Sequence, residues 1–331
     1  MKLKIGMAGC GMIARCHYVP DIKICRWAKL VGVCGKGPEE AQSFAEEMGL
    51  PRWYKNFETM VTDDSIDAVI VGTPNHLHFP QVLAAAAAGK HVLCEKPMAL
   101  NMAQAEEMTR VCRAAGVVFM VAHHLRYKAC NETTKKMVDT GELGDVSTAH
   151  IQWSFNSSQS VPNKDWHTDP SLSGGGQIMD VGSHCVDLLT YLFGPARRVS
   201  AFTRSKLYQT VEDTSVITIQ FQNGVLATAE GSYVEAGTEN SLEIFGNRSS
   251  LIVTGACSTD RYGSLRKLPG GERLKVESGI SGYTAEVDHF ARAVLDRFEP
   301  ISSGEKVLET MRILTAAYTS AESGRQEVLT R

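Results

Sequence analysis

Residues 5–14 read IGMAGCGMIA, and this stretch decides the fold of the first half of the chain. A short apolar run ends at Ala8, and the pattern Gly9-x-Gly11-x-x-Ala14 follows it and opens a stretch of helical pattern. Gly9 permits a tight turn, Gly11 lets the main chain approach a pyrophosphate, and Ala14 keeps the helix close to the strand. We therefore expect a dinucleotide-binding strand, turn and helix. A turn that uses glycine for packing alone is the alternative.

Residues 1–124 alternate short apolar runs with longer stretches of helical pattern, which is typical of a parallel sheet covered on both faces. The predicted strands are residues 5–8, 30–34, 68–71, 91–94 and 117–121, and the predicted helices are residues 38–48, 81–88 and 102–115. This part of the chain is predicted to be α/β, a doubly wound parallel sheet of the Rossmann type.

From residue 125 onward, longer strands follow one another through turns instead of helices. Residues 216–221 and 225–229 flank Asn223-Gly224, and Asn-Gly is a strong hairpin signal. Two segments of helical pattern end the chain, and we expect both to cover one face of the resulting sheet. The further segments are strands 242–245 and 251–253 and helices 286–298 and 305–323. We predict a second domain of α+β type, with an open and predominantly antiparallel sheet.

Composition excludes several classes of partner. A length of 331 residues indicates about two domains. The formal net charge of −3 leaves no basic surplus for nucleic acid or an anionic membrane. Nine scattered cysteines without a Cys-x-x-Cys pair favour a reducing compartment over a disulfide framework. The chain shows neither a signal-peptide pattern nor an apolar run of bilayer length, so we expect a cytoplasmic protein.

The end of the second predicted strand bears on the choice of cofactor. An acidic residue usually binds the adenosine ribose there in NAD enzymes, but this chain reads Cys34-Gly35-Lys36-Gly37. The missing carboxylate relieves repulsion against a 2′-phosphate, and Lys36 offers the phosphate a charge-assisted contact. We therefore expect NADP in preference to NAD. If Lys36 is a solvated loop residue and Gly35 only turns the chain, NAD is the alternative.

Two further segments supply polar groups at the carboxyl edge of the predicted sheet, where doubly wound folds bind ligands. Glu95-Lys96-Pro97 follows the fourth strand, and Thr73-Pro74-Asn75 follows the third. A lysine in the first position can reach a nicotinamide, although such a lysine taken alone would be a solvated loop residue. His76 and His78 have metal-like spacing, but nothing nearby completes a ligand set, so we expect no metal.

Residues 174–187, GGGQIMDVGSHCVD, are the most informative part of the second domain. Asp180 and His184 are four positions apart, which places both side chains on one face of a helix. Three preceding glycines give the chain freedom to bring that helix close to a ligand. Asp187 could orient the imidazole or bond within the helix. The alternative, a surface helix with incidental polar residues, loses only when this segment is combined with the motifs above.

Together these motifs resemble the family of glucose-fructose oxidoreductase and inositol dehydrogenase (Gfo/Idh/MocA). The motifs are Gly9-x-Gly11-x-x-Ala14, Thr73-Pro74-Asn75, residues 89–97 (GKHVLCEKP) and Asp180-x-Gly182-x-His184. The resemblance covers nearly the whole chain. It implies a dinucleotide-binding domain over 1–124 and a substrate-binding domain over 125–331, whose open sheet forms homodimers or homotetramers. It also implies a cis peptide bond before Pro97.

The same resemblance implies roles for individual residues. His184 accepts the proton of a ring hydroxyl, Lys96 stabilises the developing alkoxide, and Asp180 anchors a neighbouring hydroxyl or the lysine. Cofactor and substrate would meet between the two domains. The implied cofactor-binding residues are Gly9, Gly11, Met12, Ile13, Gly35, Lys36, Thr73, Pro74, Asn75, His78, Glu95 and Lys96. Arg126, Trp153, Trp166 and His167 are expected to line a sugar pocket.

We therefore expect an NAD(P)-dependent oxidoreductase that transfers a hydride between nicotinamide and a secondary alcohol or ketone of a sugar, glycoside or cyclitol. Two other interpretations stay open. The first is a glycosidase that retains NAD and oxidises a ring carbon transiently, which would turn over without net nicotinamide reduction. The second is a non-catalytic nucleotide-binding module, in which Lys96→Met and His184→Ala would have no activity to alter.

Overall fold

The computed structural model describes residues 2–157, 166–236, 238–259, 262–274, 276 and 279–329, and the chain divides into two compact units. The first unit comprises Met1–His124 and Tyr283–Leu308, and the second comprises Leu125–Gly282 and Glu309–Arg331. The predicted division near residue 124 assigned all of residues 125–331 to the second domain. The units differ from that division in one segment, because residues 283–308 return to the first unit.

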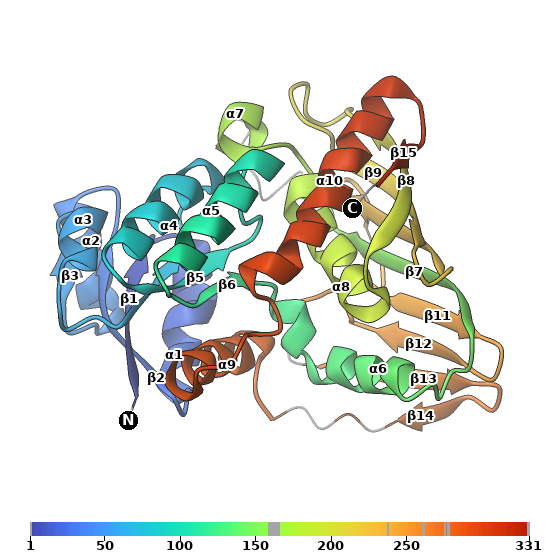
Figure 1. Cartoon of the computed structure of the whole chain (residues 1–331), viewed down its shortest axis with the longest axis horizontal. Helices are drawn as coiled ribbons and strands as arrows, with labels where there is room; N and C mark the ends of the chain where they lie inside the picture. Colours follow the sequence, from blue (N-terminus) through green and yellow to red (C-terminus); the bar gives the residue numbers. More distant parts are fainter. Residues whose placement is uncertain are drawn as a thin grey trace. The chain divides into compact units, whose positions relative to one another are not determined.

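The first unit contains a six-stranded sheet in the order β3-β2-β1-β4-β5-β6, and every neighbouring pair is parallel (Figure 1). The strands are β1 (Leu3–Ala8), β2 (Ala28–Cys34), β3 (Trp53–Tyr54), β4 (Ala68–Val71), β5 (His91–Glu95) and β6 (Phe119–Ala122). All five predicted strands are present, and the doubly wound sheet is confirmed. The prediction misses β3, because two residues at a sheet edge leave no periodic pattern.

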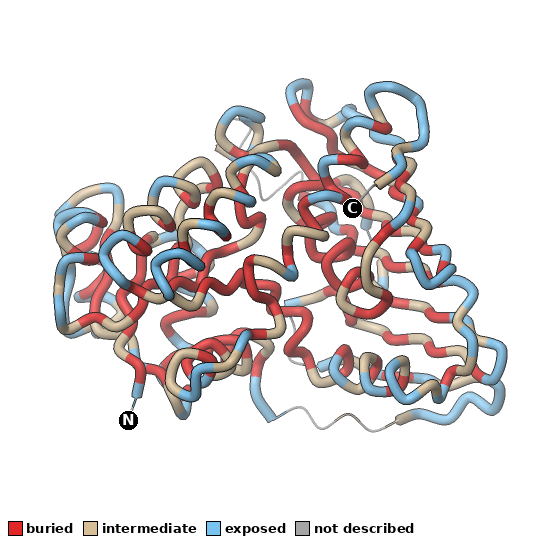
Figure 2. Tube along the Cα trace, in the orientation of Figure 1, coloured by how far each residue is buried: buried red, intermediate tan, exposed pale blue. Residues whose placement is uncertain are grey.

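Helices cover both faces of this sheet, with α4 and α5 on one side and α1 and α9 on the other (Figure 1). Figure 2 shows the buried central strands, and all four residues of β4 are buried. Pro38 occupies the first turn of α2, and Gly49, with a φ of +68°, ends it at the predicted position. The segments are η1 (Ala14–Tyr18), α1 (Val19–Ile24), α2 (Pro38–Met48), α3 (Phe57–Val61), η2 (Asn75–Leu77), α4 (His78–Ala87), α5 (Met102–Ala114) and α9 (Gly282–Asp296).

The second unit contains a nine-stranded sheet in the order β14-β13-β12-β11-β7-β10-β9-β8-β15. The strands are β7 (Val146–Ser154), β8 (Ala196–Arg204), β9 (Thr214–Phe221), β10 (Leu226–Ser232), β11 (Leu242–Gly246), β12 (Ser250–Thr254), β13 (Ser264–Leu268), β14 (Glu272–Leu274) and β15 (Glu327–Val328). β7 and β10 pair in parallel and the other pairs are antiparallel, which confirms a predominantly antiparallel sheet. The predicted hairpin joins β9 to β10 through Gly224, whose φ is +96°.

The remaining helical segments include α8, which contacts β7 and β10 and is buried at nearly every position. They are η3 (His124–Tyr127), α6 (Ala129–Asp139), η4 (Trp166–Thr168), α7 (Pro170–Ser173), η5 (Ile178–Gly182), α8 (Ser183–Phe193) and α10 (Gly304–Ser323). Within the described residues, no helix combines the length and apolar character that a bilayer span requires.

The prediction that residues 286–298 cover the second sheet is wrong, because α9 packs in the first unit. Thr284 Oγ1 donates to Asp21 Oδ1 at 2.6 Å, and the main-chain N–H of Trp27 donates to the Asp288 carboxylate at 2.9 Å. These polar partners lie more than 250 residues away along the chain, so a local pattern of apolar residues gives no sign of them.

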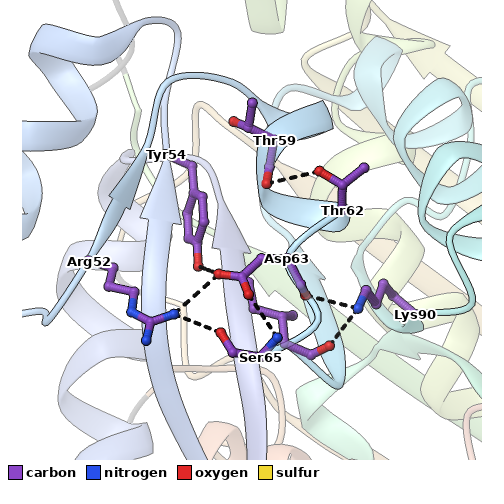
Figure 3. A network of polar contacts seen from close by, with 8 residues as sticks. Arg52, Tyr54, Thr59, Thr62, Asp63, Ser65 and Lys90 are labelled. Atoms are coloured by element: carbon purple, nitrogen blue, oxygen red, sulfur yellow. Dashed lines mark hydrogen bonds and ion pairs between the residues drawn. The ribbon is translucent and has the colours of Figure 1, made fainter.

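A polar network ties the loops at the amino ends of β4 and β5 together (Figure 3). Lys90, which precedes β5, donates through Nζ to the carbonyl oxygens of Asp63 at 3.0 Å and Ile66 at 2.8 Å. The Asp63 carboxylate accepts from Tyr54 Oη at 2.6 Å and from the Ser65 N–H at 2.7 Å. Hydrogen bonds from Tyr54 and Ser65 hold the pKa of Asp63 well below its usual range. Hydrogen bonds between side chains and the main chain therefore connect the loops at this edge of the sheet.

Candidate active site

The turn after β1 lies where the strand order reverses, between β1 and β4. Gly9 has a φ of +106°, and a Cβ atom on it would lie 2.3 Å from the carbonyl oxygen of Gly72, so only glycine fits. The N–H of Gly9 donates to the Cys34 carbonyl at 2.9 Å, and the N–H of Gly72 donates to the Ala8 carbonyl at 2.9 Å. A Cβ atom on Gly11 would meet nothing within 4 Å. The turn is thus packed closely against Gly72 at Gly9, whereas the space beside Gly11 is open. This openness suits an approaching phosphate group.

The residues after this turn separate into a packing side and a ligand side. Ala14 is fully buried, as expected for the position that holds the helix close to the sheet. Met12 is 78 % exposed, and Ile13 is half-buried between them. The helix contains a π turn over η1, which the periodicity did not predict. The predicted cofactor-binding position Met12 is therefore accessible to a ligand.

The loop after β4 is held in place by its own polar contacts. Thr73 Oγ1 donates to Gln81 Oε1 at 2.7 Å, which attaches the loop to α4. Pro74 precedes η2, and its carbonyl accepts the N–H of Leu77 at 2.9 Å. Asn75 begins η2 and is buried. The predicted turn is present, and it lies beside the glycine turn of β1 because Gly72 contacts Gly9.

His78 is a site residue that the structure places differently from the prediction. Its side chain is fully buried, with Nε2 2.9 Å from the Thr73 carbonyl oxygen and Nδ1 2.9 Å from the Pro97 carbonyl oxygen. Burial lowers the pKa of His78 to about 4, against the two carbonyl contacts, which act in the opposite direction. The ring lies between the loops after β4 and β5, and because it is buried it positions these loops and is not exposed to a ligand. In the described part of the chain, no group of three or more His, Cys, Asp or Glu residues is arranged to hold a metal ion.

The loop after β5 carries Lys96 in a constrained setting. The Lys96–Pro97 peptide bond is cis, as predicted. The buried Glu95 carboxylate accepts from Tyr18 Oη at 2.7 Å and from the Lys96 N–H at 3.1 Å. Burial, followed by the charge of Glu95, raises the pKa of the Tyr18 hydroxyl well above its usual range, so it remains a donor. Glu95, a predicted cofactor contact, thus anchors the main chain at Lys96.

The loop after β2 contacts Glu40, a residue of α2 that was not predicted as part of the site. Lys36 is exposed, and its main-chain N–H donates at 2.7 Å to Oε2 of Glu40, in the first turn of α2. A Cβ atom on Gly35 would lie 2.4 Å from the same oxygen. The predicted cofactor-binding pair at 35 and 36 therefore lies against a carboxylate. The available signal was the position of Glu40 as the third residue of α2, from which a glutamate side chain can reach back to a main-chain N–H before the helix.

In the second unit, Asp180 and His184 lie on consecutive helical segments. Asp180 belongs to the π-helix η5, where the Gly182 N–H donates to the Gln177 carbonyl at 2.9 Å, and His184 follows in α8. We predicted that both residues lie on one regular α-helix. The π turn instead places Asp180 before the α-helix in which His184 lies. His184 is buried, and its ring centroid lies 5.0 Å from that of Trp153, which is also buried.

Two side chains distant in sequence hold this segment. Tyr233 Oη donates to Asp180 Oδ2 at 2.6 Å. The buried Glu212 carboxylate accepts from the N–H groups of Ile178, at 2.8 Å, and Gly176, at 3.1 Å, and from Tyr318 Oη at 2.8 Å. A carboxylate at this amino end is favourable, because the first N–H groups of a helical segment lack partners within it. Neither residue carried a local signal.

The predicted sugar-lining residues have different surroundings. Arg126 is only 2 % exposed and forms a bidentate ion pair with Asp187, at 2.8 and 2.7 Å. The Asp187 carboxylate also accepts from Thr310 Oγ1 at 3.0 Å. Arg126 is thus part of a buried ion pair, and Asp187, considered as a partner for the imidazole, binds this guanidinium. Trp166 is half-buried and stacks on the exposed ring of His167, with centroids 3.8 Å apart.

Comparison with known proteins gives consistent matches to both halves. Residues 3–123 match the family described as "Oxidoreductase family, NAD-binding Rossmann fold", and residues 131–252 match the GFO/IDH/MocA C-terminal domain. The chain is 29 % identical over 97 % of its length to 1,5-anhydro-D-fructose reductase of Ensifer adhaerens, covering 96 % of that protein. It is also 29 % identical to D-xylose 1-dehydrogenase (NADP(+)) 2 of Haloferax volcanii, with 97 % of each chain covered. The crystal structure of aldose-aldose oxidoreductase from Caulobacter crescentus complexed with glycerol superposes with a TM-score of 0.92, at 30 % identity, covering 99 % of this chain and 100 % of that one.

Proposed function

Because this chain belongs to the GFO/IDH/MocA oxidoreductase family, we propose that it transfers a hydride between a nicotinamide dinucleotide and a secondary alcohol or ketone of a sugar, glycoside or cyclitol. The observation that carries the proposal is the edge of the first sheet. The glycine turn at residues 9–11 follows β1, and Lys96, whose N–H donates to Glu95 Oε2 at 3.1 Å, follows β5, so both lie at the carboxyl end of the same parallel sheet. The relatives named above act on sugars or sugar derivatives by name.

The residues of this edge fit a dinucleotide. A Cβ atom on Gly11 would point into open space, so the main chain there is accessible to a pyrophosphate, and Met12 is exposed beside it. We propose that residues 9–13 and 73–75 hold the dinucleotide. When bound, its nicotinamide supplies hydride acceptance or donation.

We assign the proton and charge chemistry to three side chains. Lys96 provides an ammonium group that hydrogen-bonds the reacting oxygen and stabilises the alkoxide. His184, as neutral imidazole, accepts the hydroxyl proton in the oxidative direction and returns it in reduction. Asp180 accepts a neighbouring hydroxyl of the substrate, and Tyr233 fixes its orientation through the bond at 2.6 Å. The Trp153 ring packs against the imidazole of His184 at a tilt of 34°, with centroids 5.0 Å apart.

The test is a panel of sugars and inositols with NAD and NADP supplied separately, followed by the absorbance of the reduced nicotinamide. We expect at least one substrate to reduce one cofactor, and His184→Ala to lower kcat by about 10²–10⁴-fold. His150→Ala, a matched change on β7, should leave kcat unchanged. Sustained product release without net nicotinamide reduction would instead indicate a glycosidase. Failure of both dinucleotides to bind would overturn the proposal.

We also propose that the enzyme is a homodimer or homotetramer of the cytoplasm. All nine cysteines are free thiols, which suits a reducing compartment. Phe202, Leu226 and Phe245 are exposed apolar residues on β8, β10 and β11 of the second sheet. A sheet face of this kind is expected to be covered by a second copy. Light scattering after size exclusion should report two or four subunits, and a monomer would contradict this assembly.

A further inference from the structure

The adenosine end of the proposed dinucleotide site lacks the acid usually found at the end of the second strand. That acid binds the ribose hydroxyls in NAD enzymes. Gly35 occupies the position in this chain, and the expectation of NADP rests on the missing carboxylate and on the charge of Lys36. The structure supplies a carboxylate from another element.

Glu40 reaches back from the first turn of α2 to the loop after β2. Its Oε2 accepts the Lys36 N–H at 2.7 Å, and a Cβ atom on Gly35 would lie 2.4 Å from that oxygen. The carboxylate therefore fills the space that an acidic side chain at residue 35 would enter. Gly35 lies outside the left-handed region, so its backbone does not require glycine; the missing side chain at residue 35 leaves room for the exposed Glu40 carboxylate.

The same carboxylate lies beside the glycine turn. A Cβ atom on Gly35 would lie 3.0 Å from Cys10 Sγ, between the two glycines of that turn. Burial, followed by the negative charge of Glu40, raises the pKa of the Cys10 thiol to about 12. The start of α2 favours a negative charge, because unpaired N–H groups gather at a helix amino end. Glu40 is thus held where the loop after β2 meets the turn after β1.

We propose that Glu40 is the specificity-determining residue that binds the adenosine ribose diol and makes the enzyme prefer NAD to NADP. The inference rests on the proposed function. With Oε2 bonded to the Lys36 N–H, Oε1 can accept a ribose hydroxyl. A 2′-phosphate would meet this negative charge and would find the Lys36 N–H already in use. Lys36 and Glu40 are both exposed, so solvent and salt weaken the attraction by the ammonium as well as the repulsion by the carboxylate. The Glu40 carboxylate is, however, positioned by its hydrogen bond to the Lys36 N–H.

The experiment measures binding of NADH and NADPH to the full-length protein by isothermal titration calorimetry. For the natural chain we expect a Kd for NADPH about 10- to 100-fold above that for NADH, because like charges repel across a partly screened site. Glu40→Gln keeps the side-chain length and removes the charge. It should raise the Kd for NADH about tenfold and bring the ratio of the two Kd values close to one. Glu39→Gln, at the preceding position of α2, should keep the natural ratio.

A charge relocation sharpens the test. Gly35→Asp combined with Glu40→Ala moves the carboxylate to the other residue in the same space, and it should recover the preference for NADH. Tighter binding of NADPH by the natural chain, or an equal change of both Kd values in Glu40→Gln, would overturn this inference and leave the proposed function intact. Absence of binding of either dinucleotide would overturn the proposed function as well.

Discussion

Strands β4 and β5 are clamped together at both ends by a buried side chain that contacts two main-chain carbonyls, and the two clamps differ in chemistry. At the amino end, Lys90 Nζ donates to the carbonyls of Asp63 and Ile66, at 3.0 and 2.8 Å (Figure 3). At the carboxyl end, the His78 ring lies between the carbonyls of Thr73 and Pro97, each at 2.9 Å. One clamp is an ammonium group, and the other is an imidazole whose pKa burial lowers to about 4.

The two side chains differ in the number of hydrogen bonds that they can donate and in the charge that they bring to each end of the strands. The Lys90 ammonium group has three donors and therefore satisfies both carbonyls at once. A neutral imidazole has one N–H, so it can donate to only one carbonyl at a time. Burial keeps His78 neutral, and the positive charge of Lys96 acts in the same direction on its pKa. A neutral His78 therefore donates to one of the two loops at a time and adds no charge beside Lys96.

The largest expected effect comes from removing the cation at the carboxyl end. Lys96→Met should lower kcat by about 10²–10³-fold, equivalent to about 3–4 kcal/mol, because a donor to the developing alkoxide is lost. Its melting temperature should change little. Steady-state rates on the substrate found in the panel and thermal melts measure both quantities. Retention of more than a third of the natural kcat would remove Lys96 from the reaction.

The next effect is a loss of stability in acid caused by the carboxyl-end clamp. His78 has a folded pKa of about 4 against about 6.5 in the unfolded chain, so the unfolded chain takes up the proton first. Its contribution to stability is complete above about pH 6.5 and declines as the pH falls toward 4, by about 2–3 kcal/mol between pH 7 and 4.5.

Urea unfolding at several pH values tests this dependence. His78→Gln should flatten that part of the profile, whereas His167→Gln, at an exposed ring, should retain it. His289 has a pKa lowered to about 4 by burial and then by Arg292 and Lys306, so it contributes a slope of the same sign that remains in His78→Gln. Unfolding free energies that rise on acidification would contradict both assignments.

Local patterns predicted much of the fold and less of the site. Apolar runs identify strands such as residues 68–71, and the Asn223-Gly224 pair identifies its hairpin, because neighbouring residues alone determine both features. The placement of α9 was wrong because it depends on Tyr283. That ring stacks on His17 and His124, each with centroids 4.3 Å apart, and the three residues are separated widely in sequence.

Residue type and spacing identified candidate site residues without revealing how their polar atoms are satisfied. His78 and Arg126 have the chemistry of ligand contacts, but both are buried against partners of the protein itself. The sequence does not indicate roles for Glu40 and Glu212, because both carboxylates bind main-chain N–H groups that come close to them only in the folded chain. The Lys96–Pro97 cis bond was predicted from family resemblance, because no physical pattern in the sequence indicates it.

A smaller effect is expected at the amino-end clamp. Lys90→Met keeps the length of the apolar stem and leaves the carbonyls of Asp63 and Ile66 without their donor, which should cost about 2 kcal/mol of unfolding free energy. Turnover of the folded protein should be unchanged, since this edge is opposite to the proposed cofactor edge. Lys29→Met, at an exposed position of β2, serves as the control in urea unfolding. If Lys90→Met lowers kcat and leaves the unfolding free energy unchanged, the structural role assigned to Lys90 is wrong.

The smallest effect separates the two parts of the amino-end network. Asp63→Asn removes the charge that accepts from Tyr54 Oη and the Ser65 N–H but keeps the carbonyl that Lys90 binds, so it should cost about 1 kcal/mol at neutral pH. The pKa of Asp63 is lowered, so its contribution is present above the ordinary carboxyl range and is lost as the pH falls through the folded value. Tyr54→Phe and the double variant isolate the coupling between the two side chains. A loss as large as that of Lys90→Met would mean that the Asp63 carboxylate, and not the ammonium group, holds the loops at this end.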